Sequence, residues 1–243
     1  MLFFFKYVDY KYEDAIYRSL VTANWVKNDQ EQTFKNLLNL THNIQTDRRE
    51  YINELYGMNP FKSRWMRSGD IQLLDASGSC GNFSHVLAEL CLHADMDVRI
   101  VQLIHQGLFG GHNIVEVLVN NKWVAADGLW KMYFINSDST LASLEDIKSN
   151  LDFFAKQIPT DYPYMNAYLE YHYTNWDKIP FLMPAIYNGL KLILGEKRTN
   201  EISLRVYFLN LHKAHFYFLW ILYLPILIFT LYVFYQILIK DYR

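Results

Sequence analysis

The segments that decide the fold are Gly78-Ser79-Cys80-Gly81-Asn82-Phe83-Ser84, Gly110-Gly111-His112-Asn113-Ile114-Val115-Glu116-Val117 and Lys122-Trp123-Val124-Ala125-Ala126-Asp127. The first segment carries a cysteine between small residues, the second a histidine ahead of an alternating run, and the third ends at an aspartate. In this order they supply a thiol nucleophile, a base and an acid that can orient the base. The three segments together predict a cysteine-dependent catalytic site.

Cys80 is predicted to open an amphipathic helix. Ser79 is a favoured N-cap residue, because its hydroxyl can accept a hydrogen bond from a free backbone N–H of the first turn. Apolar residues then recur at three- and four-residue steps and predict a buried face, which contains Phe83, Val86, Leu87, Leu90 and Cys91. The dipole and free N–H groups at a helix start lower a thiol pKa, and the Cys80 backbone N–H can donate to a developing oxyanion.

The histidine and the aspartate are predicted to lie on neighbouring strands. A β-branched run at residues 98–104 predicts one strand, and residues 106–111 are expected to form a Gly-containing loop. His112 is expected to open the next strand, and an Asn-Asn turn then leads into a strand that ends at Asp127. Because the two ends of an antiparallel pair lie side by side, His112 and Asp127 are expected to hydrogen-bond.

Each of these residues also has a common structural role. A cysteine on a helix is often a small buried apolar residue, a histidine at a strand end is often a satisfied polar group, and Asp before Gly is a frequent turn element. A Cys/His/Asp metal site is a weaker alternative, because zinc sites favour close ligand pairs such as Cys-x-x-Cys. The occurrence of all three residues on matched elements favours a triad, with no metal and no cofactor.

The three segments resemble the core of the transglutaminase-like superfamily, whose fold is papain-like. The resemblance covers residues 78–128, about a fifth of the chain: Gly-x-Cys opening a helix, Gly-His leading a strand with Val-Glu-Val, and Trp-Val before Asp. It implies an α+β fold in which the helix that bears the cysteine packs on an antiparallel sheet that bears the histidine and the aspartate. It also implies that Cys80 is the nucleophile, His112 the base and Asp127 the residue that orients His112.

The resemblance implies a thiol-dependent amide or ester hydrolase or acyltransferase, of protease or transglutaminase type, that acts through a thioester. Water gives hydrolysis of the thioester and an amine gives transfer, and the sequence leaves both open. The substrate would be a peptide, a protein or another acyl compound. Two alternatives remain: a catalytically silent interaction module with the same fold, and a component of an envelope or cell-surface polymer assembly machine.

A second oxyanion donor is not evident in the sequence. Papain-like proteases carry a glutamine shortly before the cysteine for this purpose, and Gln72 lies eight residues before Cys80. Trp65 is the other candidate. His85 is expected to face away from the thiol, because five residues turn a helix by about 140° from the starting position. His105, across the predicted loop from the catalytic histidine, is interpreted as a plain loop residue.

Composition excludes one class of partner and favours one compartment. The net charge of the 243 residues is −2, with Lys and Arg spread along the chain, so nucleic acid is not an expected partner. Cys80 and Cys91 fall eleven residues apart on one predicted helix, about 16 Å along its axis, which is too far for a disulfide. Both are therefore expected to be free thiols, as is typical of a reducing compartment.

The chain is predicted to have four parts. Residues 1–70 form an N-terminal helical part, with one or two packing helices between Asp29 and Tyr56, and residues 71–135 form the catalytic core. Residues 136–210 form a helical, Tyr-rich accessory region in which residues 143–154 are a polar-faced helix. Its aromatic residues are expected to pack over the core, or else to form a membrane-interface belt: Tyr162, Tyr164, Tyr168, Tyr171, Tyr173 and Trp176.

The fourth part is a predicted transmembrane helix. Residues 216–239 contain no charged residue, and about 20 apolar residues suffice to span the hydrocarbon of a bilayer. A buried core helix is the alternative. Residues 1–5 are followed at once by charges and are too short for a signal peptide. The sequence therefore predicts a single-pass, tail-anchored protein whose catalytic domain faces the cytoplasm and whose substrate or partner is associated with the membrane.

Overall fold

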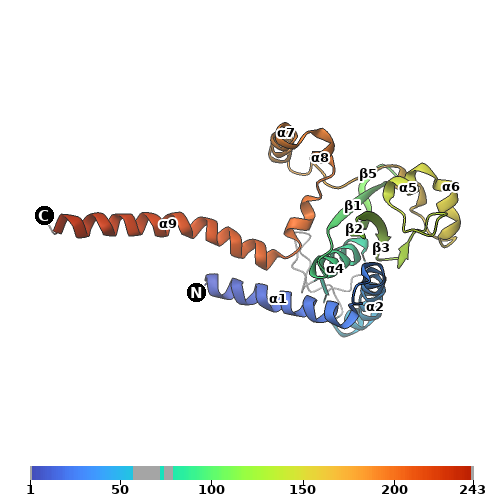
Figure 1. The fold of residues 1–243 in the computed structure, drawn as a ribbon, viewed down its shortest axis with the longest axis horizontal. Helices are drawn as coiled ribbons and strands as arrows, with labels where there is room; N and C mark the ends of the chain where they lie inside the picture. The colour runs from blue at the N-terminus through green and yellow to red at the C-terminus, as the bar shows by residue number, and fades with distance from the viewer. Residues whose placement is uncertain (1, 57–71, 74–78, 242–243) are drawn as a thin grey trace.

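The computed structural model describes residues 2–56, 72–73 and 79–241. The fold is α+β, with a five-stranded sheet in the order β4-β3-β2-β1-β5 (Figure 1). The strands are β1 (Val98–His105), β2 (Leu108–Val119), β3 (Lys122–Asp127), β4 (Met132–Tyr133) and β5 (Tyr171–His172). Every neighbouring pair is antiparallel. The α+β class and the antiparallel sheet agree with the prediction.

Two tight turns connect the three long strands. Gln106 and Gly107 have φ angles of 51° and 73°, and Asn120 and Asn121 have φ angles of 50° and 64°. Positive φ at both central positions is the geometry whose twist matches paired strands. The prediction of a loop over residues 106–111 is therefore wrong after Gly107: β2 begins at Leu108, and His112 lies inside the strand, opposite Leu103.

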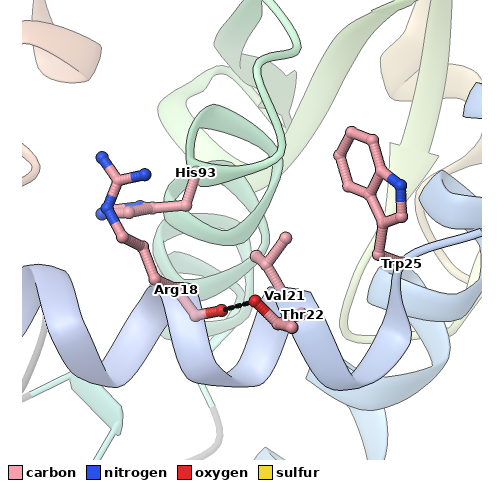
Figure 2. Close-up of a pocket in the computed structure, with 5 residues that line it drawn as sticks. All are labelled: Arg18, Val21, Thr22, Trp25 and His93. Carbon is pink, nitrogen blue, oxygen red and sulfur yellow. Dashed lines mark hydrogen bonds between the residues drawn. The ribbon is translucent and has the colours of Figure 1, made fainter. Parts of the chain in front are cut away.

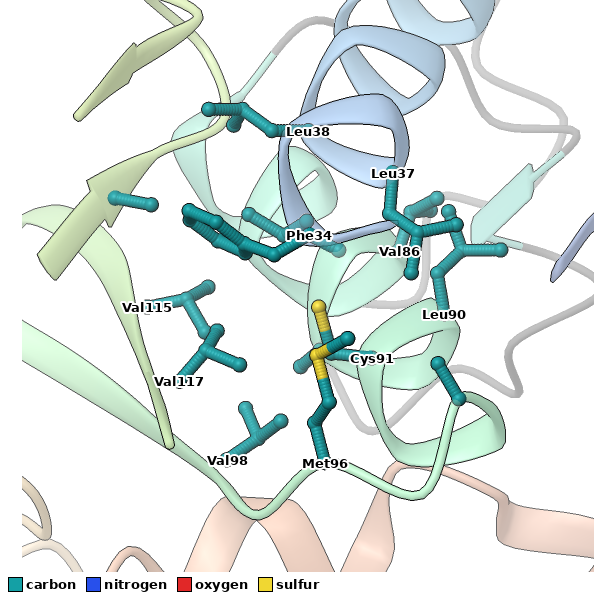
Figure 3. Packing of buried hydrophobic residues seen from close by; sticks show 14 of the residues in the cluster. Phe34, Leu37, Leu38, Val86, Leu90, Cys91, Met96, Val98, Val115 and Val117 are labelled. Atoms are coloured by element: carbon teal, nitrogen blue, oxygen red, sulfur yellow. The ribbon is translucent and has the colours of Figure 1, made fainter. Parts of the chain in front are cut away.

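Three helices cover one face of the sheet: α1 (Leu2–Asn24), α2 (Gln30–Tyr56) and α4 (Cys80–His93). Helix α4 begins at the cysteine, as predicted, and is buried from Asn82 to Cys91 because α1, α2 and the sheet all pack against it. Figure 3 shows the resulting core, in which Phe34 and Leu37 of α2 meet α4 and the β-branched residues of β1 and β2. Cys91 lies in this core, and both cysteines are free, as predicted.

The opposite face is covered by short elements: α5 (Leu144–Ser149), α6 (Leu151–Phe154), η1 (Ala155–Gln157) and η2 (Met165–Leu169). The prediction of one helix over residues 143–154 is wrong, because Asn150 has φ −144° and ψ 59° and separates α5 from α6. Ser143 and Asp146 form a capping box that fixes the start of α5. A second core, which includes Ile114, Phe134 and Tyr168, lies between these elements and the sheet.

The rest of the chain leaves this body through α7 (Leu182–Leu194), α8 (Glu196–Asn200), η3 (Leu204–Phe208) and α9 (Leu211–Asp241). Helix α9 projects far beyond the sheet, and the N-terminal end of α1 runs beside its first turns (Figure 1). Within its segment Leu211–Leu238, the most apolar window of 18 residues has a mean hydropathy of 2.1 and contains no buried residue. This helix is long and apolar enough to cross a membrane, and the alternative of a buried core helix is wrong.

Candidate functional site

Cys80 is the first residue of α4 and is half-buried. Ser79 occupies the N-cap position in an extended conformation, but the predicted capping hydrogen bond from its hydroxyl is absent. The hydroxyl instead donates to Asn82 Oδ1 at 3.2 Å, so the side-chain amide of the first turn replaces the backbone as its partner. The backbone N–H groups of Asn82 and Phe83 donate to the carbonyl oxygen of Ser79 at 2.9 and 3.4 Å, and Cys80 lies at the positive end of the helix dipole.

His112 and Asp127 lie on the same face of the sheet. Val115 pairs with Ala126, so the register of β2 and β3 places Asp127 two residues along from His112 on that face. The distance from His112 Nε2 to Asp127 Oδ2 is 2.5 Å, and both side chains are fully buried. The hydrogen bond expected from antiparallel pairing is present.

Asp127 accepts further hydrogen bonds that hold it in place. Its Oδ1 accepts from the backbone N–H groups of Leu129 and Trp130 at 3.0 and 3.2 Å. Its Oδ2 accepts from the Tyr162 hydroxyl at 3.0 Å, and that hydroxyl also contacts the hydroxyl of Tyr168 at 3.1 Å. Four donors on one buried carboxylate match the demand of an ionised group, so Asp127 is well suited to orient an imidazole.

Tyr164 covers His112. The two rings are stacked at a centroid distance of 3.9 Å and an interplanar angle of 1°. Burial disfavours the charged imidazole, but hydrogen bonds and charge interactions with Asp127 and Cys80 outweigh it and raise the pKa of His112 to about 9. An aromatic face beside an imidazolium adds to this effect. The histidine is therefore held in its protonated form near neutral pH.

The pKa of the Cys80 thiol shifts downward, opposite to that of His112. Burial disfavours the thiolate, yet the hydrogen bond and charge of His112, together with Asn113, lower the pKa of Cys80. Asn113 Nδ2 donates to Cys80 Sγ at 3.5 Å. His112 Nδ1, the nitrogen not used by Asp127, is buried and meets no acceptor at good hydrogen-bond geometry among the described residues. Such contacts are often long in the absence of substrate, and the paired shifts favour a thiolate beside an imidazolium.

Arg205 of η3 reaches the same end of α4. Its Nη2 donates to the carbonyl oxygen of Gly81 at 3.3 Å. Burial lowers its pKa, and the Cys80 thiolate acts in the opposite direction. A half-buried guanidinium thus lies beside the first turn of α4 and adds positive charge where a thiolate or an oxyanion would develop.

Only one of the two candidates for the second oxyanion donor, Gln72, falls within the described residues. Trp65 lies outside the described residues. Gln72 is buried, its backbone carbonyl accepts from Gln45 Nε2 at 3.1 Å, and its Oε1 has no hydrogen-bond partner within the described part of the chain. In that same part no hydrogen bond joins Gln72 to Cys80, whereas Asn113 and the guanidinium of η3 do approach the thiol.

Sequence reasoning missed four residues around the triad: Asn113, Tyr162, Tyr164 and Arg205. Asn113 directly follows His112, and its position next to the histidine was the one available local signal. The two tyrosines belong to the Tyr-rich segment, which contacts the histidine and aspartate directly. His105 is the last residue of β1 rather than a loop residue, and its ring meets the edge of Tyr164 at 5.0 Å.

A surface depression of about 270 Å³ lies at the other end of α4 (Figure 2). It is lined by Arg18, Val21, Thr22, Trp25 and His93. His93 is thirteen residues after Cys80, about 20 Å along the helix axis at roughly 1.5 Å per residue. This depression is therefore separate from the thiol. Among the described residues no group of three His, Cys, Asp or Glu side chains is arranged to hold a metal ion.

Comparison of the chain with models of known protein families, with curated proteins and with solved structures finds no match. The interpretation of this site therefore rests on its own geometry.

Proposed function

We propose that this protein is a thiol-dependent amide or ester hydrolase or acyltransferase with a papain-like arrangement of Cys80, His112 and Asp127. The observation that carries the proposal is the buried His112–Asp127 hydrogen bond next to a half-buried thiol at the start of a helix. The opposite pKa shifts of the cysteine and the histidine support it, because they favour the reactive ion pair. A purely structural cysteine needs no such partners.

The chemistry follows from the position of each group. The Cys80 thiolate attacks the acyl carbon, and the bond to the leaving amine or alcohol breaks after that group takes a proton from His112. The enzyme then carries a thioester on Sγ. His112, now neutral, takes a proton from water or from an acceptor amine, which attacks the thioester and releases the thiolate. Asp127 keeps the imidazole oriented and stabilises its charged form.

The oxyanion of this reaction has three candidate donors. The backbone N–H of Cys80 lies at the start of α4, and the side-chain amide of Asn113 reaches the sulfur itself. The Arg205 guanidinium supplies positive charge in the same region. Preorganised donors at such a position contribute on the order of 3 kcal/mol each to transition-state stabilisation.

The proposed location is a membrane, with α9 as the span and the catalytic domain in the cytoplasm. The two free cysteines are typical of a reducing compartment. Arg205, which contacts the first turn of α4, precedes the first residue of α9 by only six positions. Six residues reach at most about 20 Å, which limits the distance between the backbone of Arg205 and the first residue of α9. We infer that the acyl substrate is itself associated with the membrane.

An electrophilic thiol probe tests the proposal. We expect an alkylating probe to label Cys80 far faster than Cys91, whose pKa burial raises well above its usual range. His112→Ala is expected to slow labelling of Cys80 by more than tenfold, because the thiolate loses its cationic partner. Cys91 is the internal control, since it lies in the core away from the histidine.

Equal and slow labelling of the two cysteines would instead favour the catalytically silent interaction module. Hydrolysis and transfer are distinguished by adding an amine acceptor during turnover of a thioester-forming substrate. A new amide product identifies a transferase, and an unchanged yield of free acid identifies a hydrolase. Either result requires Cys80→Ala to abolish turnover.

A further inference from the structure

Helix α7 carries an apolar surface that the rest of the described chain does not cover. None of its thirteen residues is buried. Leu192 is 88% exposed, Ile193 78% and Leu182 55%, and the preceding Phe181 is 92% exposed. At about 100° per residue these side chains lie on the side of α7 opposite Tyr187, which packs on Trp176 at a centroid distance of 5.3 Å. One side of α7 thus faces the protein and the other is left without a partner in the described residues.

The length of α7 limits what can cover this surface. About 20 residues are needed to cross the hydrocarbon of a bilayer, so a helix of thirteen is too short to span it. Helices that are apolar on one side and too short to span lie in the plane of the interface, with the apolar side buried about 5–10 Å into the headgroup and acyl boundary. The dimensions of α7 fit this arrangement.

The position of α7 relative to α9 supports a lipid partner. In Figure 1, α7 and the N-terminal end of α1 both lie on the side of the sheet toward which α9 extends. The ring centroid of Phe3 in α1 lies 4.7 Å from that of Phe216 and 5.0 Å from that of Trp220. The start of α1 therefore lies at the level where the uncharged segment of α9 begins. Aromatic side chains gather at this level of membrane proteins.

Helix α1, which lies on the other side of α9 from α7 in Figure 1, carries a second exposed apolar row. Phe4, Val8 and Tyr12 follow one another at four-residue steps, and their side chains are 64%, 44% and 65% exposed. A contiguous row of exposed apolar side chains is typical of a surface that contacts a partner or a membrane. We propose that α7 and the N-terminal half of α1 form a lipid-contacting surface that lies in the membrane interface beside α9. The inference rests on the proposed membrane location and goes beyond it, because α9 alone suffices as an anchor.

Site-directed fluorescence tests this surface in the full chain. A single cysteine is introduced at Ile193 in a Cys80→Ser background, labelled with an environment-sensitive fluorophore, and the protein is reconstituted into phosphatidylcholine vesicles. Cys91 remains in place, because it is fully buried. Nitroxide-bearing lipid is then added. A label on the apolar side of α7 should lie about 5–10 Å deep in the interface, so the nitroxide is expected to quench about half of the emission of the Ile193→Cys label.

Three matched positions complete the design. Thr230→Cys in α9 reports whether the span is inserted and should be quenched. Asn188→Cys, on a less apolar side of α7, should be quenched less than the label at position 193. Lys156→Cys in η1 should not be quenched, because η1 directly follows α6, which lies at the end of the molecule remote from α9 (Figure 1).

The outcomes separate the claims. A label at position 193 that reports water, while the label at 230 is quenched, overturns the lipid surface and leaves the anchor intact. A label at 193 that is shielded from water but not quenched by lipid identifies a protein partner and also overturns the inference. An unquenched label at 230 overturns the inference and the membrane location together. Because Cys80 is absent, none of these results depends on the proposed thiol chemistry.

Discussion

At the scale of single residues, the candidate site includes two neutral side chains that donate hydrogen bonds to its ionisable groups. Asn113 donates to the sulfur, and Tyr162 donates to the carboxylate that orients the histidine. Hydrogen bonds to charged groups contribute about 1.5–3 kcal/mol, more than neutral ones. Removing either donor should therefore change a measurable property of the charged group it serves.

Asn113→Ala is expected to raise the pKa of Cys80 by about one unit, because the thiolate loses a donor and one unit corresponds to about 1.4 kcal/mol. The pH dependence of Cys80 alkylation measures this pKa directly. Asn188→Ala, on the exposed surface of α7, is the matched control and should leave the profile unchanged. An unchanged profile for Asn113→Ala would remove Asn113 from the site.

Tyr162→Phe is expected to destabilise the protein by about 2 kcal/mol, because Asp127 loses a donor and the Tyr168 hydroxyl loses its partner in a buried site. Urea unfolding in detergent solution measures the change. Tyr171→Phe is the control: its hydroxyl donates to Glu145 on the surface, where the loss should stay below about 0.5 kcal/mol. Equal effects of the two substitutions would contradict the role assigned to Tyr162.

At the scale of elements, the helix and the hairpin of the site were predictable because local rules determine them. The three- and four-residue spacing predicted α4, although the structure buries every residue from Asn82 to Cys91 rather than one face. Antiparallel pairing alone brought His112 to Asp127. The strand start at Leu108 was missed because a two-residue turn at Gln106-Gly107 leaves no loop. The sites of Tyr162 and Tyr164 were not predictable, since they depend on where the chain returns after α5 and α6.

Gly111 sets the spacing between β1 and β2 next to His112. A Cβ at this position would lie 2.8 Å from the Cβ of His105, closer than two carbons pack. Gly111→Ala is therefore expected to cost about 1–3 kcal/mol in unfolding free energy, as overpacking does. Gly189→Ala in α7 is the control, because open space surrounds that glycine and a helix gains about 0.5–1 kcal/mol from alanine. Thermal unfolding should show opposite signs for the two variants.

Glu89 gives α4 a pH dependence. Burial raises its pKa from 4.5 to about 7, while Lys213 acts against the shift and Asp14 with it. Between these values the folded protein holds a proton that the unfolded chain has lost, so the contribution of Glu89 to stability falls as pH rises through this window. Glu89→Gln should remove that loss and be more stable than wild type above pH 7, by at most about 3 kcal/mol.

Unfolding of both proteins from pH 4.5 to 8 tests this prediction. Burial also lowers the pKa of His85 to about 3, which gives an opposite slope below pH 6.5 in both proteins. The difference between the two curves therefore isolates the glutamate. A difference that stays constant with pH would contradict the raised pKa.

At the scale of the whole molecule, α9 carries the proposed location. Leu231→Lys places a charge near the middle of the span and is expected to cost about 2.5–3.5 kcal/mol of insertion free energy. The fraction of protein that resists alkaline extraction from membranes should fall accordingly. Ile135→Lys, on the exposed surface of the α+β body, is the control and should leave that fraction unchanged.

The short connection from Arg205 through η3 to α9 has a consequence for kinetics. Because this connection is short, the α+β body that carries the thiol cannot move far from the start of α9. Under the proposed function and location, the enzyme meets its substrate by lateral diffusion in the two dimensions of the membrane. Its turnover would then follow the number of substrate molecules per unit area of membrane. Added inert lipid lowers that number and would slow turnover even when the volume concentrations of enzyme and substrate are unchanged.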